Sequence, residues 1–145
     1  MKEKIEIVYR KPSKEEFILL RNSAGWGIPQ DEFIQKGIDN TVCWVCAELD
    51  GKLIGFARII GDSAFAFLIL DVVVLTEYRG YGVGTKIVEG LMKFLYQNAA
   101  DGAYIALLSA KGLEPFYEKF GFWKRPNDDF GYGMMMFLDK SKASV

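Results

Sequence analysis

The feature that most constrains this chain is a strand that leads through a glycine-rich turn into a long helix and then into a second strand. Residues Ala64 to Leu75 are apolar on both alternating faces, which is typical of a strand inside a covered sheet. From Gly82 to about Asn98 apolar residues recur at helical spacing, and Ala103 to Leu108 then has the pattern of a short buried strand. This order predicts a right-handed parallel crossover.

The strands before the crossover are predicted to be antiparallel. Ile5 to Tyr9 alternates as a first strand does, and Asp50-Gly51 joins two apolar runs, Val42 to Leu49 and Leu53 to Ile60. An aspartate-glycine pair between such runs favours a tight hairpin turn. The expected fold is therefore α/β of the α+β kind, with a mixed, mostly antiparallel central sheet, a β-α-β crossover and flanking helices.

Two helices are expected between the first strand and the hairpin. Ser13 and Glu16 have the spacing of a capping box, so one helix begins there and should carry inward Phe17, Leu19 and Leu20. A second, from Asp31, should contact the core through Phe33 and Ile34 and end at Gly37.

The C-terminal part is predicted to add a helix and a final pair of strands. Leu113 to Phe120 gives one or two helical turns. Phe122 to Lys124 and Met134 to Leu138 follow as two strands, with the methionines in the core apart from one that points outward.

Composition excludes several classes of function. The 145 residues, 50% hydrophobic and 26% charged, are expected to form one domain, residues 1–145. With 18 Lys and Arg against 19 Asp and Glu, the chain lacks the basic excess of a nucleic-acid binder. Its longest apolar run is too short to span a bilayer. We therefore expect a cytoplasmic protein with neither a nucleic-acid nor a membrane partner.

Two residue types limit the chemistry further. The chain has no histidine, which removes catalytic sites built on imidazole and histidine metal sites. Cys43 and Cys46 have the spacing of a redox pair, but they lie in a strand-like run, where an offset of three points to opposite faces. We expect two reduced, buried cysteines without a redox or metal role.

The segment from Arg79 to Thr85 carries the clearest chemistry. Gly80, Gly82 and Gly84 lie where a strand turns into a helix, and glycines leave backbone N–H groups uncovered there. A helix N-terminus favours an anion, and Arg79 adds a positive charge. The spacing fits neither the dinucleotide fingerprint nor the P-loop. It predicts a diphosphate ligand rather than a turn shaped only by packing.

The run Arg79-Gly80-Tyr81-Gly82-Val83-Gly84 resembles the signature of the GNAT superfamily of acetyl-coenzyme A dependent N-acetyltransferases, Gln/Arg-x-x-Gly-x-Gly/Ala after a central strand. Phe116-Tyr117, followed by Gly121-Phe122, is similar to a second family element, an aromatic-tyrosine pair on a short helix. The order of the surrounding elements fits from Ile5 to Leu138. The resemblance implies a GNAT-type fold and acetyl-coenzyme A as co-substrate, with no metal.

The resemblance also implies roles for the matching positions. The coenzyme A diphosphate would bind the backbone of Arg79, Gly80, Tyr81, Gly82, Val83, Gly84 and Thr85. Pantetheine would run along Val72, Val73 and Val74, where one N–H would hold the oxyanion, with Leu108 and Ser109 on the opposite wall. Tyr117 matches the tyrosine that protonates the departing thiolate, as a phenol can at neutral pH. The alternative is that Phe116 and Tyr117 are core aromatics.

Asp71 is the only charged residue between Ala64 and Leu75. Because a buried charge without partners is costly, its carboxylate has either a function or satisfying partners. It is a candidate general base or acceptor-orienting group. The alternative is a hydrogen-bonding role at a distortion of the strand.

The acceptor site is expected in the first helices and the last loop, because the coenzyme uses the middle of the chain. Its candidate residues are the aromatic Trp26, Phe33, Phe130 and Tyr132, with Trp123 beside them and Asp62, Asp128 and Asp129 as nearby charges. Such a pocket suits a small cationic amine, whereas the alternative is core packing and solvated loop charges. The run Ile54 to Asp62 and the context of Asp71 to Val74 resemble an arylalkylamine or serotonin acetyltransferase-like branch.

The sequence thus predicts an enzyme that moves an acetyl group directly from acetyl-coenzyme A to a primary amine, a small molecule. The alternatives are a protein lysine or N-terminal acetyltransferase and a non-catalytic acyl-coenzyme A binding regulatory module. A homodimer is in keeping with the family resemblance.

Overall fold

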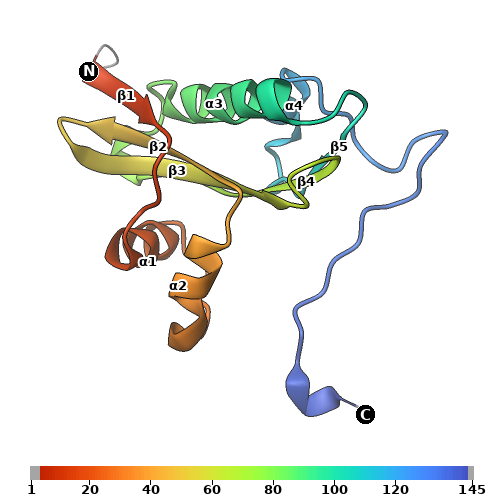
Figure 1. The fold of residues 1–145 in the computed structure, drawn as a ribbon, viewed down its shortest axis with the longest axis horizontal. Coiled ribbons are helices and arrows are strands. Elements are labelled where there is room, and N and C mark those ends of the chain that lie inside the picture. The colour runs from red at the N-terminus through yellow and green to blue at the C-terminus, as the bar shows by residue number, and fades with distance from the viewer. Residues whose placement is uncertain (1–3, 144–145) are drawn as a thin grey trace. The chain divides into compact units, whose positions relative to one another are not determined.

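A five-stranded sheet organises the first part of the chain, with its strands in the order β1-β2-β3-β4-β5 (Figure 1). The strands are β1 (Ile5–Val8), β2 (Cys43–Leu49), β3 (Lys52–Gly61), β4 (Ala66–Val74) and β5 (Tyr104–Leu107). The first three neighbouring pairs are antiparallel, whereas β4 and β5 are parallel. The predicted mixed, mostly antiparallel sheet is confirmed.

The computed structural model describes residues 4–143, and the chain divides into two compact units with the boundary between Leu107 and Leu108. The helices of the first unit are α1 (Lys14–Ser23), α2 (Asp31–Asp39), the short η2 (Thr76–Tyr78) and α3 (Val83–Asn98). Those of the second are α4 (Glu114–Glu118) and the short η3 (Lys140–Lys142). The assignment of the whole chain to one domain stays a prediction.

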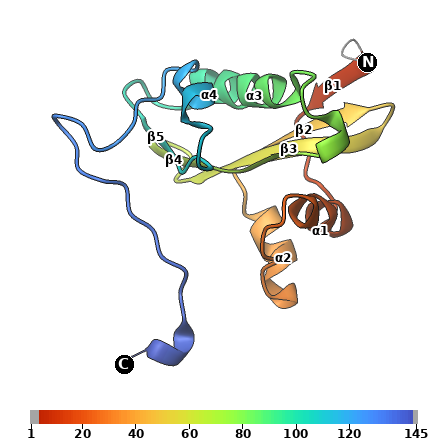
Figure 2. The ribbon, with the colours of Figure 1, turned by 180° about the vertical axis from the view of Figure 1, so that it is seen from behind.

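Helices cover both faces of the sheet in the first unit. In Figure 1 α3 lies above the strands and α1 and α2 lie below them, and the reverse view in Figure 2 shows the same two layers. Trp44 of β2 packs edge-on against Phe17 of α1 and Phe56 of β3, with ring centroids 6.2 and 5.2 Å apart. The next residue, Val45, faces α3, where a Cβ added to Gly90 would lie 2.9 Å from Val45 Cγ1. Glycine therefore lets α3 approach β2 closely.

The predicted hairpin and crossover are both present. Asp50 and Gly51 have φ of +50° and +80°, the left-handed conformation that a tight two-residue turn requires. After β4, the chain passes through α3 and returns as β5, parallel to β4. Local turn chemistry and helical spacing were thus sufficient to predict the centre of the fold.

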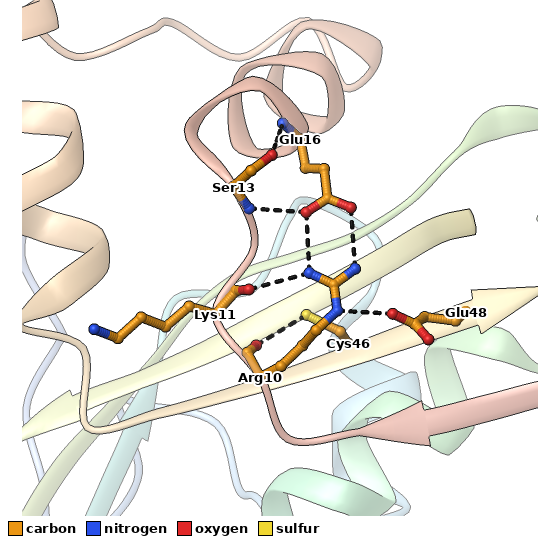
Figure 3. A network of polar contacts seen from close by, with 6 residues as sticks. All are labelled: Arg10, Lys11, Ser13, Glu16, Cys46 and Glu48. Atoms are coloured by element: carbon orange, nitrogen blue, oxygen red, sulfur yellow. Dashed lines mark hydrogen bonds and ion pairs between the residues drawn. The ribbon is translucent and has the colours of Figure 1, made fainter. Parts of the chain in front are cut away.

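Helix α1 begins with the predicted capping box and is tied to the sheet by Arg10. Ser13 Oγ accepts the Glu16 N–H at 3.1 Å, and the Glu16 carboxylate accepts the Ser13 N–H at 2.8 Å. The same carboxylate accepts two hydrogen bonds of 3.0 Å from Arg10, whose Nε donates to Glu48 of β2 at 2.7 Å (Figure 3). One arginine therefore joins the end of β1, the start of α1 and β2.

Two apolar side chains expected in the core are instead exposed. Leu19 is 55% exposed and Phe33 51% exposed. The buried residues of the two helices are Phe17 and Leu20 in α1, and Ile34 and Ile38 in α2. The two buried residues are three positions apart in α1 and four apart in α2, so within each helix they lie on the same face. Leu19 and Phe33 lie off the buried face of their helix.

Gly37 does not end α2, which continues to Asp39. The Asn40 amide donates to the Lys36 carbonyl at 2.8 Å, and Thr41 Oγ1 donates to the Gly37 carbonyl at 2.9 Å. Side chains thus satisfy carbonyls of the last turn, and no left-handed glycine is needed there.

The predicted final pair of strands is wrong. Among residues 4–143 no strand is present at 122–124 or 134–138. The side chains from Met134 to Leu138 are between 60% and 90% exposed, so the methionines are not core residues. The Asn127 N–H donates to the Phe130 carbonyl at 2.9 Å, but this turn does not continue into a ladder. An isolated two-stranded hairpin is marginal in water, so an apolar run alone does not ensure a strand.

Candidate functional site

The junction between β4 and α3 has an exposed backbone shaped by glycine. Gly80 and Gly82 have φ of +84° and +79°, a conformation in which a side chain would be strained. Gly82 is the N-cap of α3 and provides no side-chain hydrogen bond. The N–H groups of the first helical turn therefore lack a side-chain cap and can serve as donors to an anion.

The surroundings of this helix start fit a diphosphate. A Cβ added to Gly80 would meet no atom within 4 Å, so the space beside that residue is open. Arg79 is exposed, and its Nε donates to the Val74 carbonyl at 3.2 Å, which places the guanidinium at the end of β4. The other residues predicted to bind the diphosphate differ in exposure. Tyr81 and Thr85 are exposed, Gly84 is half-buried and Val83 is buried.

Within residues 4–143, the second half of β4 has no paired strand on the edge that faces β5. Strand β5 pairs with β4 only from Ala66 to Ile69, and it ends at Leu107. Beyond Ile69, β4 continues to Val74, and among the described residues this stretch is paired only with β3. Backbone N–H groups on the β5 side of this stretch are therefore left for another acceptor. Val72, Val73 and Val74, the predicted pantetheine strand, all lie here.

Asp71 lies at a distortion of β4. The strand has two residues, Asp71 and Val72, where β3 has only Ala57, which makes a β-bulge. Asp71 has φ of +56°, an uncommon conformation for a residue with a side chain. The distortion that the sequence analysis weighed as an alternative is thus present.

Two arginines hold the Asp71 carboxylate. Arg21 Nη1 of α1 donates to Oδ1 at 2.6 Å, and Arg58 Nε of β3 donates to Oδ2 at 2.7 Å. The Asp71 side chain is only 10% exposed, so the two guanidinium ions supply the partners that a buried carboxylate needs. This geometry favours the hydrogen-bonding role, and the general-base role stays a prediction.

Arg21 and Arg58 were not predicted as site residues from the sequence. The sequence did contain a signal for Arg58. An isolated carboxylate in a buried strand requires a nearby cation, and Arg58 lies in the antiparallel strand next to that of Asp71. Arg21, by contrast, is 50 residues away from Asp71 along the chain. Only the packing of α1 on the sheet reveals that contact.

Of the predicted acceptor residues in the first unit, Trp26 lies beside this cluster. The Arg21 guanidinium lies over the Trp26 ring, 5.5 Å from its centroid. Phe33 is exposed on α2. Asp62 Oδ1 accepts the N–H groups of Ala64, Phe65 and Ala66, so this carboxylate shapes the turn before β4.

Tyr117 belongs to the second unit, in α4. Its side chain is 8% exposed and packs edge-on against Phe116 and Phe122, with ring centroids 5.0 and 6.5 Å apart. Burial raises the pKa of Tyr117 above its usual value of 10.0. The hydroxyl makes no hydrogen bond to any described residue. A protonated phenol can act as an acid.

The other predicted residues of the second unit are more exposed. Ser109 is half-buried, and its Oγ donates to the Ala110 carbonyl at 2.7 Å. Phe130 is 45% exposed and lies against Trp123, with ring centroids 5.2 Å apart, and Tyr132 is 74% exposed. These aromatic side chains are available to a ligand and do not form a closed core.

The chain matches the family model of the acetyltransferase (GNAT) domain over residues 39–124. It belongs to the GNAT acetyltransferase family. The matched region contains the glycine turn, Asp71 and Tyr117. The GNAT fold and the enzyme class predicted from the sequence are therefore confirmed.

Individual relatives agree with this assignment. A solved structure of a probable acetyltransferase from meticillin-resistant Staphylococcus aureus is similar with a TM-score of 0.82 and 30% identity, covering 92% of this chain and 99% of that chain. The chloroplastic GCN5-related N-acetyltransferase 2 of Arabidopsis thaliana is 41% identical over 75 residues, 52% of this chain and 28% of that protein. The chloroplastic serotonin N-acetyltransferase 2 of Oryza sativa subsp. japonica is 28% identical over 102 residues, 68% of this chain and 50% of that protein. The chain thus spans at most half the length of these two curated relatives.

Two further features of residues 4–143 concern membrane-spanning helices and metal-binding groups of side chains. None of the helices in this range is long and apolar enough to cross a membrane. The same range holds no group of three or more histidine, cysteine, aspartate or glutamate side chains placed to bind a metal ion.

Proposed function

We propose that this GNAT domain transfers the acetyl group of acetyl-coenzyme A to a primary amine. The observation that carries the proposal is the start of α3, where the left-handed Gly82 leaves the first-turn N–H groups without a side-chain cap. Arg79 and the open space at Gly80 complete a place suited to a diphosphate. The backbone from Arg79 to Thr85 holds this part of the coenzyme.

The open stretch of β4 takes the other end of the coenzyme. Pantetheine runs along Val72, Val73 and Val74. A backbone N–H of β4 donates to the thioester carbonyl and stabilises the negative charge that develops on its oxygen. The missing β5 partner beyond Ile69 supports this assignment, because it leaves backbone donors in β4 free.

The transfer is direct. The amine nitrogen forms a bond to the thioester carbon, the carbon–sulfur bond breaks, and Tyr117 donates its hydroxyl proton to the departing sulfur. The proton that the amine loses passes to solvent, and Tyr117 takes a proton back from solvent before the next turnover. The raised pKa of Tyr117 supports this role, because it keeps the phenol protonated at neutral pH.

The acceptor is a small amine with an aromatic or apolar group. Trp26 and Phe33 of the first unit provide ring surfaces for it. The similarity to a rice protein named as a serotonin acetyltransferase supports the same class of acceptor. A cytoplasmic location is part of this proposal.

The test is release of coenzyme A thiol from acetyl-coenzyme A in the presence of arylalkylamines, polyamines, amino acids and lysine peptides. A mildly alkaline pH leaves more of each amine unprotonated. We expect thiol release that depends on arylalkylamines, with the acetylated amine identified by mass spectrometry. Release with lysine peptides alone would assign the domain to protein acetylation. Binding of acetyl-coenzyme A without turnover of any amine would make it a binding module.

We also propose that the chain forms a homodimer. The apolar side chains from Met134 to Leu138 support this, because monomeric proteins rarely leave such a run in water. Light scattering after size-exclusion chromatography should give the mass of a dimer. Replacing Met134, Met136 and Leu138 with glutamine should weaken it, and a wild-type chain that stays monomeric contradicts the proposal.

A further inference from the structure

We propose that Asp71 and Arg21 form a clamp, braced by Arg58, which holds the loop of residues 24–30 on the sheet and thereby positions the amine acceptor. The inference rests on the proposed function. It gives Asp71 a positioning role, in which the carboxylate acts through Arg21 and does not take a proton from the amine.

The clamp links β4 to the loop through one side chain. Arg21 donates one hydrogen bond to Asp71 Oδ1 at 2.6 Å, and its Nε and Nη2 donate to the Gly27 carbonyl at 3.0 and 2.6 Å. Within the described residues, Gly27, Ile28 and Pro29 make no other hydrogen bond. The carbonyl of Gly27 is therefore the point at which this part of the loop is fixed.

The same guanidinium contacts the ring of Trp26, whose backbone N–H donates to the Arg21 carbonyl at 3.1 Å. The guanidinium lies 5.5 Å from the centroid of the Trp26 ring and 5.6 Å from that of Phe17 in α1. Such contacts favour one position of the ring over others. Trp26 is a proposed acceptor residue, so we expect a change that moves the Arg21 guanidinium to alter the position of the Trp26 ring in the acceptor site.

Arg58 braces the carboxylate from the other side. Its Nε donates to Asp71 Oδ2 at 2.7 Å, and its Nη1 donates to Thr41 Oγ1 at 3.1 Å. Its guanidinium also lies over Trp44, 5.8 Å from the ring centroid. The bulge turns Asp71 so that each oxygen meets one arginine. The oxygen atoms that a general base would offer to the amine are already accepting from cations.

Kinetics of two variants separate the clamp from a base. We expect Asp71→Asn and Arg21→Lys each to raise KM for the amine by about tenfold, while kcat, its pH profile and KM for acetyl-coenzyme A change by less than about threefold. The double variant should be no worse than the more affected single variant, because both break one linkage. If Asp71→Asn instead lowers kcat by about a hundredfold or more at unchanged KM, and Arg21→Lys does not, Asp71 is the base and the clamp is overturned.

A spectroscopic measurement tests the clamp independently of turnover. The full chain is labelled with 5-fluorotryptophan, and the Trp26 resonance is assigned with Trp26→Phe. We expect that resonance to shift or broaden in Asp71→Asn and in Arg21→Lys, while the Trp123 resonance stays in place. An unchanged Trp26 resonance overturns the clamp even if the domain is an active acetyltransferase. A shifted resonance in a chain that acetylates no amine rejects the proposed function and leaves the loop contact standing.

Glu48→Gln is the matched control. It weakens an ion pair of similar length, Arg10 with Glu48 at 2.7 Å, on the same sheet but without contact to the loop. We expect it to leave both KM for the amine and the Trp26 resonance unchanged. Equal effects of Glu48→Gln and Asp71→Asn would show a general loss of stability and would contradict the positioning role.

Discussion

Arg10 and Glu16 are joined by two hydrogen bonds of 3.0 Å each, so a guanidinium and a carboxylate meet side by side at the start of α1. The bond to Arg10 is the main reason that the pKa of Glu16 lies below its usual value of 4.5. A carboxylate whose pKa is lower in the folded state than in the unfolded state makes the folded protein more stable at every pH above the unfolded-state pKa. This contribution is lost as the pH falls through the folded-state pKa.

Glu16→Gln should therefore lower the free energy of unfolding by about 1 kcal/mol at pH 7, because the pair is partly exposed. Glutamine preserves the capping box, so the variant isolates the ion pair. Urea denaturation at several pH values checks this, with the exposed Glu15→Gln as the control. The difference between wild type and Glu16→Gln should shrink as the pH falls below 4.5. A difference that is the same at every pH contradicts the ion-pair explanation.

Gly82→Ala should weaken coenzyme A binding by about tenfold or more, measured by isothermal titration calorimetry. Gly82 has φ of +79°, so a Cβ forces the backbone to shift and moves the donors at the start of α3. Gly102→Ala is the matched control, because Gly102 has φ of +78° in a turn outside the proposed site. Both variants should lose similar stability. Unchanged affinity in a folded Gly82→Ala variant would place the diphosphate elsewhere.

The two cysteines should react with a thiol reagent only after unfolding. Both are buried, and burial raises the pKa of Cys43 to about 11 and that of Cys46 to about 12. Few thiolates are therefore present at neutral pH. Labelling with a chromogenic disulfide should be slow in native protein and should reach two thiols per chain in urea. Rapid labelling of the native chain, with loss of turnover, would point to a functional thiol.

The structure confirms those sequence predictions that depend on neighbours in the chain. Asp50-Gly51 predicted a hairpin because the turn conformation is a property of these two residues. Ser13 and Glu16 predicted the start of α1 for the same reason. The glycine turn before α3 was found from spacing alone.

The predictions that failed depend on contacts between distant segments. Leu19 and Phe33 were placed in the core because they are apolar, but the packing of each helix decides which of its faces is buried. The run from Met134 to Leu138 has the composition of a strand and no partner among the described residues. The sequence predicted that the buried carboxylate of Asp71 needs either a function or partners. It did not predict Arg21 as a partner, because the two residues are brought together only by the packing of α1 on the sheet.

Steady-state kinetics of Tyr117→Phe show whether this chain catalyses acetyl transfer with Tyr117 as the acid. The change removes one hydroxyl from a buried ring and retains its packing. We expect kcat to fall by about a hundredfold or more, while affinity for acetyl-coenzyme A stays unchanged. Tyr96→Phe, at an exposed position on α3, should behave as wild type. Wild-type turnover in Tyr117→Phe would show that Tyr117 is not the acid.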